Sequence, residues 1–559
     1  MTGPVTSQSG IGLRPRLAPL LVLVATLPPL YGLWLSQGTP MEEGFMLVFP
    51  EMVLDGRVPN RDFLHLYGPG SLWVLAAVFA VFGVSLAAER TIGLLQHLAV
   101  GFGVQRLLRP WGPWVSGGGG ALATLVVITP SGLSAMAWIG GLGLGLLGLS
   151  AIIDAEEHLD GSRSQQRAAL VGGGLLGLAL LYRLDLGLAV LASVLVVASG
   201  LGRAARWRLG AGLVAGCSPY LVHLAMAGPG NVLRGLVIEP VFDLRGGRHL
   251  PLPPSTDRFD GFLQGAGALD QAPWPLPAPS GPRQLWLWLL ALLAVGIVLV
   301  VAGWVSRRRT GQLRLLAIAA FSVGIFPQAL QRPDSTHLAW VSCVAFAVLP
   351  AAIIELQRAR RTTADKRPPR LPLAIAAVAV PVVSLLVVAP FFTFRSYAEA
   401  TVQSTGRRVT EGVIEHRGRS FPYKRPDAVA AVNEMLPVVE ALTEPGDRLV
   451  VGPGDLRKTP YSEAFLYYLL SDLVPGTRYI EMDPGVANAD DSGLAEEIAA
   501  ADVVILSTIR DDWNEPNDSL DFGPDEPNQV LRDEFCLRGS FGVSPFDPGR
   551  GLYELYLRC

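Results

Sequence analysis

Long apolar runs separated by short polar loops fill the sequence from Leu17 to Thr393. A membrane-spanning helix needs about 20 mostly apolar residues, and the runs therefore predict about eleven spans. These spans cover residues 17–36, 91–108, 114–130, 134–153, 168–182, 186–201, 209–227, 284–304, 313–330, 336–355 and 371–393. The pattern predicts a polytopic α-helical membrane protein whose transmembrane domain is formed by residues 1–393.

The pattern changes after residue 393 to short segments that fit a water-exposed fold. Helices are predicted at 426–442, 461–473, 493–501 and 528–535, and strands at 448–451, 478–482, 502–506 and 552–557. Strands that alternate with helices are typical of an α/β domain. We therefore expect residues 394–559 to form such a domain around a largely parallel sheet.

One apolar run, residues 71–84, is short for a span, and the charges of the loops decide its placement. If this run does not cross the membrane, all the basic loops lie on one side. They contain Arg14 and Arg16, Arg106 and Arg109, Arg163 and Arg167, Arg203, Arg206 and Arg208, Arg307–Arg309 with Arg314, and Arg358–Arg370. Because positive residues gather on the cytoplasmic side, we predict that 71–84 is a juxtamembrane helix. The N-terminus is then cytoplasmic, and the domain 394–559 is extracytoplasmic.

The composition agrees with a multi-pass protein of the cell membrane. Half of the residues are hydrophobic, 17% are charged, and the mean hydropathy is +0.38. A net charge of −3 argues against a nucleic-acid partner. The long loop 228–283 is rich in Pro and Gly, which predicts an irregular external segment. Cys536 and Cys559 both fall in the predicted external domain, where oxidation permits a disulfide between them.

The segment from Met41 to Gly70, MEEGFMLVFPEMVLDGRVPNRDFLHLYGPG, is the candidate chemical centre. It forms most of the first external loop, predicted at residues 37–70, and carries polar side chains directly after an apolar span. The same topology places two polar corners on its side of the membrane. The candidate residues are Glu42, Glu43, Arg61, Asp62, His65 and Tyr67 of the loop, Arg183 and Asp185 of one corner, and Arg332, Asp334 and His337 of the other. Ionisable groups at membrane depth are costly and tend to be functional, although each one alone also fits an interfacial cap.

These residue types fit the transfer of a sugar from a polyprenyl-phosphate donor. The leaving phosphate needs a permanent charge and a forked donor, which Arg supplies, and we assign this role to Arg183 and Arg332. The acceptor hydroxyl needs a base, which is Glu42 or Glu43. A single displacement would invert the anomeric centre. Paired acids also bind divalent metals, but no third converging carboxylate is identifiable, so no cofactor is predicted.

The loop motifs also carry a family resemblance. The matching residues are Glu42-Glu43-Gly44, Leu54-Asp55-Gly56, Pro59, Asp62-Phe63 and Tyr67-Gly68-Pro69-Gly70. They resemble the first external loop of the GT-C superfamily of membrane glycosyltransferases, and are similar to bacterial protein O-mannosyltransferases and aminoarabinose transferases. The family usually has Asp-Glu where this chain has Glu42-Glu43. The resemblance implies that Glu42 holds the catalytic acidic position and that 71–84 is the juxtamembrane helix.

The leading hypothesis is therefore a glycosyltransferase that passes a sugar from a polyprenyl-phosphate donor in the bilayer to an extracytoplasmic glycan, lipid or protein. A transporter or flippase of a lipid-linked intermediate is the second, although its route would also place ionisable residues near the midplane. A non-catalytic scaffold of the same fold is the third. Glu42 and Glu43 also fit a capping role at the start of the helix near Phe45.

Overall fold

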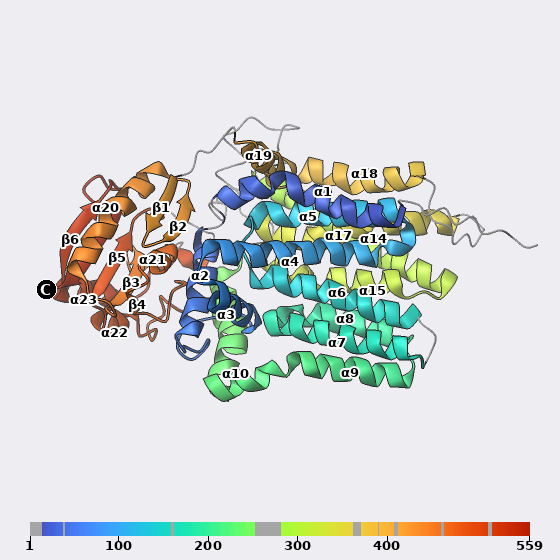
Figure 1. The fold of residues 1–559 in the computed structure, drawn as a ribbon, viewed down its shortest axis with the longest axis horizontal. Helices are drawn as coiled ribbons and strands as arrows, with labels where there is room; N and C mark the ends of the chain where they lie inside the picture. Colours follow the sequence, from blue (N-terminus) through green and yellow to red (C-terminus); the bar gives the residue numbers. More distant parts are fainter. Residues whose placement is uncertain are drawn as a thin grey trace, which may run out of the picture.

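The computed structural model describes residues 14–36, 38, 40–157, 161–251, 281–360, 371–389, 391–406, 412–459, 463–511 and 517–559. A helix bundle forms one part of the molecule, and a mixed α/β region packs at one end of it (Figure 1). The bundle part contains α1 (Arg14–Leu35), α2 (Pro40–Leu54), α3 (Gly70–Phe82), α4 (Leu86–Leu107), α5 (Pro113–Ser131), α6 (Ala137–Glu157), α7 (Arg163–Tyr182), α8 (Gly187–Ala198), α9 (Arg203–Cys217), α10 (Pro219–Ala227), α11 (Pro229–Leu233), η3 (Arg234–Asp243), α12 (Leu244–Arg248), α14 (Gly281–Thr310), α15 (Arg314–Gly324), α16 (Phe326–Gln331), α17 (Ser335–Arg360), α18 (Leu371–Val388), η5 (Phe391–Arg395) and α19 (Ser396–Gln403).

Each of the eleven apolar runs coincides with helix, so the chain is a multi-pass helical membrane protein as predicted. Among the described residues, seven helical stretches are long and apolar enough to cross a membrane. They are Leu17–Leu35, Ala137–Glu157, Arg203–Ala227, Gln284–Thr310, Arg314–Gln331, Ser335–Arg360 and Leu371–Val388. The number of spans and their orientation stay predictions.

The helices differ in how much of their surface other helices cover. In α17, 89% of the apolar window is buried, whereas the windows of α1 and α18 are each 28% buried. A central helix that is apolar on all sides packs against other helices. A peripheral helix with exposed apolar side chains suits a lipid environment. The helices α7 and α9 approach closely because glycines face each other: a Cβ at Gly212 would lie 2.1 Å from the carbonyl oxygen of Leu170.

The C-terminal α/β region, residues 412–559, is built on a five-stranded sheet of order β4-β3-β5-β7-β6. Its elements are β1 (Gly412–His416), β2 (Arg419–Tyr423), α20 (Pro426–Leu442), β3 (Arg448–Pro453), α21 (Phe465–Leu469), β4 (Val474–Pro475), α22 (Leu494–Ala499), β5 (Val503–Ser507), η6 (Asp518–Leu520), α23 (Glu526–Glu534), β6 (Phe535–Phe541) and β7 (Tyr553–Arg558). The strands β4, β3 and β5 are parallel, and β7 is antiparallel to both β5 and β6.

The sheet corrects the prediction that it is largely parallel. The strands β6 and β7 pair as antiparallel neighbours at the end of the chain, and no helix lies between them to make a parallel crossover. The prediction also missed β6 and the β1–β2 hairpin, whose register aligns Ile414 with Phe421.

Two further segments of this region differ from their predicted structure. Residues 478–482 form no strand: the edge strand β4 ends at Pro475, which has no N–H to continue a ladder. The carbonyl of Arg478 instead accepts a hydrogen bond from Leu64 N at 2.9 Å. The predicted helix 461–473 is reduced to Phe465–Leu469, and residues 461–462 lie outside the described residues.

The loop 228–283 is also corrected. Its first part is helical, as α11, η3 and α12, because the apolar residues between its glycines are enough to pack one face. Leu236 and Leu244 are buried there. Residues 252–280, which hold most of its prolines, lie outside the described residues.

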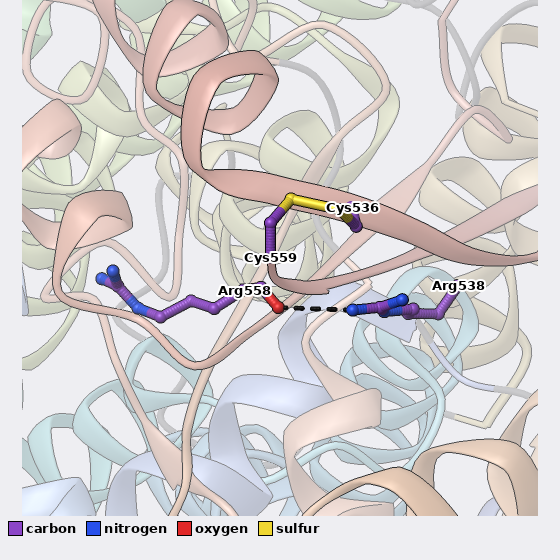
Figure 2. The surroundings of a disulfide bond; sticks show 4 residues. All are labelled: Cys536, Arg538, Arg558 and Cys559. Carbon is purple, nitrogen blue, oxygen red and sulfur yellow. Dashed lines mark hydrogen bonds between the residues drawn. A yellow bond between two sulfur atoms is a disulfide. The ribbon is translucent and has the colours of Figure 1, made fainter.

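A disulfide joins Cys536 on β6 to Cys559, the pair expected from the sequence, with their Cα atoms 5.2 Å apart. Figure 2 shows the bond beside the β6–β7 ladder, where Arg538 donates a hydrogen bond to the carbonyl of Arg558 at 3.5 Å. The disulfide thus ties the last residue to the sheet.

The helices α2 and α3 lie at the end of the bundle that meets the C-terminal region (Figure 1). Phe45, Phe49 and Leu75 share one hydrophobic core with Phe421 and Phe465 of the C-terminal region. Across this interface Glu51 pairs with Arg419 at 2.5 Å. The candidate segment 41–70 is therefore held between two packed bodies.

Candidate functional site

Glu43 lies in the first turn of α2 and is fully buried. Both of its carboxylate oxygens bind Arg90 of α4, at 2.7 Å to Nε and 2.9 Å to Nη2. Arg90 also donates to the carbonyls of Leu33, Trp34 and Ser36, where α1 ends. The pair therefore joins three helices and satisfies carbonyls that the end of α1 leaves without helical partners.

Glu42, the neighbouring residue, is only partly buried and faces a different environment. Its charge acts on Glu481 of the C-terminal region, a residue that the sequence reasoning did not select. Burial, together with the charges of Asp483 and Glu42, raises the pKa of Glu481 to about 8, although Arg248 acts to lower it. Of the two acids at the start of α2, Glu42 is thus the one whose charge acts on an ionisable group of the C-terminal region.

Arg248, at the end of α12, binds two acids of the C-terminal region. Its Nη2 lies 3.2 Å from Glu481 Oε1 and its Nη1 lies 3.1 Å from Asp483 Oδ1. All three side chains are largely buried, with 24%, 14% and 3% of their surfaces exposed. This mixed cluster places an arginine fork at the interface between the bundle and the C-terminal region.

Arg183, a predicted site residue, ends α7 and packs against the loop that follows α2. Its guanidinium carbon lies 4.0 Å from the ring centre of Tyr67 and 5.2 Å from that of Trp138, both cation–π contacts. It also binds both carboxylate oxygens of Asp185, at 3.0 and 2.5 Å. The corner at 183–185 and Tyr67 therefore lie in contact.

In the Tyr67-Gly68-Pro69-Gly70 motif, Gly68 packs directly against the backbone at the end of α7. Gly68 N donates to the carbonyl of Tyr182 at 3.1 Å. A Cβ on Gly68 would lie 2.0 Å from the carbonyl oxygen of Leu181, so a side chain there would push the loop off α7.

The second corner forms its own network between α16 and α17. Arg332 Nε lies 3.2 Å from Asp334 Oδ2, and Asp334 binds His337 Nδ1 at 2.7 Å. The ring of His337 packs on Trp340, with centres 4.9 Å apart. Arg332 Nη1 also donates to the backbone carbonyl of Arg248 at 3.1 Å, which links this corner to the mixed cluster.

The remaining loop candidates take part in local structure. Arg61 and Asp62 pair through two contacts of 2.8 Å, and Arg61 donates to the carbonyl of Met226 on α10. Asp62 also accepts from Val58 N at 2.7 Å and closes a turn. Among the described residues, the contacts of this pair lie toward α10 and not toward the two corners.

His65 is buried, and burial lowers its pKa to about 3. It is therefore neutral near pH 7, and its ring lies edge-on to that of Tyr67, with centres 5.7 Å apart. These contacts indicate that His65 supports the aromatic packing behind Tyr67.

Charged groups from distant segments of the chain act on the hydroxyl of Tyr67. Burial raises the pKa of its hydroxyl, and the charges of Arg183, Glu481, Arg248 and Asp483 all act on it. The site therefore combines α2, the two polar corners, α12 and the C-terminal region. In the described part of the chain, no group of three or more His, Cys, Asp or Glu residues is placed to hold a metal ion.

Sequence reasoning missed Arg90, Arg248, Glu481 and Asp483. Three of them carried a weak signal. Arg90 is a charge at the start of an apolar helix, and Glu481 and Asp483 are two acids spaced by one residue. Nothing local indicated that these residues meet residues of segment 41–70 and its neighbours.

Over nearly the whole chain, the fold is similar to that of a protein of known structure. ArnT from Cupriavidus metallidurans, solved bound to undecaprenyl phosphate, superposes with a TM-score of 0.51 at 15% identity, over 96% of this chain and 97% of that chain. The archaeal oligosaccharyltransferase AglB from Archaeoglobus fulgidus, in complex with an inhibitory peptide and a dolichol-phosphate, gives a TM-score of 0.46 at 13% identity, over 90% of this chain and 70% of that chain. No protein-family model and no curated protein matches the sequence. At these identities the likeness concerns the fold.

Proposed function

We propose that the protein is a GT-C-type glycosyltransferase that moves a sugar from a polyprenyl-phosphate donor to an extracytoplasmic acceptor. The observation that carries the proposal is a set of polar groups from distant segments at one end of the bundle: Arg332 donates to the carbonyl of Arg248, Arg248 pairs with Glu481, and the charge of Glu42 acts on Glu481. The likeness in fold to ArnT over nearly the whole chain supports it.

In this proposal Glu42 is the base. It accepts the proton of the acceptor hydroxyl as the hydroxyl oxygen bonds to the anomeric carbon. The bond from that carbon to the phosphate oxygen breaks in the same displacement, so the configuration inverts and the polyprenyl phosphate leaves. Glu43 is bound on both oxygens by Arg90, which leaves it less suited to accept the proton.

The arginines serve the leaving phosphate. Its negative charge grows as the bond breaks, and preorganised guanidinium groups stabilise that charge. Arg332 and Arg248 are assigned to this contact, and Arg183 adds its charge from behind the Tyr67 ring. The C-terminal region is assigned to the extracytoplasmic side, where it would receive the acceptor.

The test is a transfer assay in membranes that contain the full-length protein, using a panel of labelled polyprenyl-phosphate sugars. Glu42→Gln is expected to lower the transfer rate by about 10²–10⁴-fold, the usual contribution of a general base. Glu42→Asp keeps the carboxylate and is expected to retain measurable transfer. Wild-type rates in Glu42→Gln would refute the assignment, and carrier translocation without transfer would favour the flippase.

A further inference from the structure

Residues 481–485 of the C-terminal region grip α12 of the membrane part. Glu481 and Asp483 bind the two terminal nitrogens of Arg248, at 3.2 and 3.1 Å. Each acid contacts one terminal nitrogen of the guanidinium group. Without these contacts, an arginine side chain can adopt many rotamers. The direction in which Arg248 points is therefore set from the C-terminal region.

The backbones meet as closely as the side chains. A Cβ on Gly247 would lie 2.7 Å from the carbonyl oxygen of Pro484, and a Cβ on Gly485 would lie 3.2 Å from that of Asp243. Gly485 also has a φ of +80°, a conformation that favours glycine. The small residues on both sides thus permit this contact, which would be blocked by ordinary side chains.

From α12 the contacts continue into the membrane part. Leu250 N donates to the carbonyl of Gln331 at 3.1 Å, and Arg332 donates to the carbonyl of Arg248 at 3.1 Å. Arg332 in turn binds Asp334 at 3.2 Å. One continuous set of polar contacts therefore runs from Glu481 and Asp483 to the corner before α17.

We propose that Glu481 and Asp483 are positioning residues that hold Arg248, and through it Arg332, for the phosphate of the lipid carrier. The inference rests on the proposed function and deepens it: the C-terminal region completes the donor site as well as facing the acceptor. Preorganisation of this kind matters because a displacement of about 1 Å at a reacting group costs about 100-fold in rate.

The experiment measures saturation binding of undecaprenyl phosphate to the full-length protein in lipid nanodiscs. The double variant Glu481→Gln/Asp483→Asn keeps the shapes of both side chains and replaces each carboxyl group by an amide. It is expected to weaken binding by about tenfold or more, because Arg248 loses its fixed direction. The control Asp455→Asn breaks a comparable pair with Arg457, at 2.7 Å within the C-terminal region, and is expected to leave binding unchanged.

A triple variant separates positioning from a general structural effect. Arg248→Ala alone is expected to weaken binding at least as much as the double variant does. Adding the two acid substitutions to Arg248→Ala is expected to cause no further loss, since they act through Arg248. A further loss in the triple variant would overturn the proposal. So would unchanged or tighter binding in the double variant, because the acids would then be irrelevant or repulsive to the phosphate.

The same experiment distinguishes this inference from the proposed function. If the wild-type protein shows no saturable binding of undecaprenyl phosphate, the proposed donor is wrong and the positioning role falls with it. If the wild type binds and the double variant binds equally well, only the positioning role is wrong.

Discussion

Substitutions in the buried pair of Glu43 and Arg90 test whether Glu43 has a structural role and Glu42 a chemical one. Their side chains are 0% and 1% exposed, and the pair makes two contacts shorter than 3 Å. Glu43→Gln keeps the shape of the side chain and removes the charge that compensates Arg90. Breaking a buried ion pair in this way costs about 3–5 kcal/mol of unfolding free energy. Glu42→Gln, at a partly buried position, is expected to cost less than about 1 kcal/mol.

The reverse substitution completes the cycle. Arg90→Gln leaves the Glu43 carboxylate buried without its main cation, and the cost is again about 3–5 kcal/mol. In the double variant neither charge is present, so the two costs are not additive, and the coupling is expected to be about 2 kcal/mol or more. Part of the Arg90 cost stays in the double variant, because the carbonyls of Trp34 and Ser36 lose their donor.

The measurement is the stability of the purified protein in mixed detergent micelles as denaturing detergent is added. The wild type, the two single variants, the double variant and Glu42→Gln are compared under one condition. The reasoning is refuted if Glu43→Gln unfolds at the wild-type midpoint while transfer is lost. Glu43 would then take part in the transfer reaction and not in stabilising the fold. Equal destabilisation by Glu42→Gln would also contradict the different roles assigned to the two acids.

Three further predictions follow from contacts elsewhere. Replacing Cys536 and Cys559 together by Ser opens a loop with a sequence separation of 23 residues, and should lower the stability of the C-terminal region by about 3 kcal/mol, measured by proteolysis with and without reductant. Gly44→Leu should loosen α2 from α21, because a Cβ there meets backbone at 2.8 Å, and protease sensitivity should rise; Gly210→Leu, with nothing within 4 Å, is its control. The raised pKa of Glu481, about 8, means that the folded state holds a proton that the unfolded state releases. The stability contributed by this proton is therefore present near pH 4 and is lost as the pH rises through about 8. The unfolding midpoint of the wild type should fall relative to that of Glu481→Gln over this range. A difference between the two midpoints that does not change with pH would contradict the raised pKa.

Features of this protein that depend on local sequence were predicted well, and features that depend on contacts between distant segments were not. The apolar runs and the disulfide pair were predicted well, since hydropathy is local and Cys536 and Cys559 lie in one short terminal segment. The sheet was predicted only in part: β3, β5 and β7 were found, but β6 and its pairing with β7 depend on contacts that no local pattern specifies. Residues 478–482 have strand-like composition and serve the interface instead.

For the site, the sequence by itself indicated the kind of groups and predicted that they lie on one side of the membrane. Charges after an apolar span are expensive to bury, so the segment 41–70 and the corners at Arg183 and Arg332 stood out without a structure. Only the tertiary structure distinguished Glu42 from Glu43, because the two are adjacent in sequence and differ in what they meet. Arg90 binds Glu43 from another helix, whereas the charge of Glu42 acts on Glu481 of the C-terminal region. Ion pairs and desolvation depend on distances of a few ångströms between segments far apart in the chain, and the fold alone sets those distances.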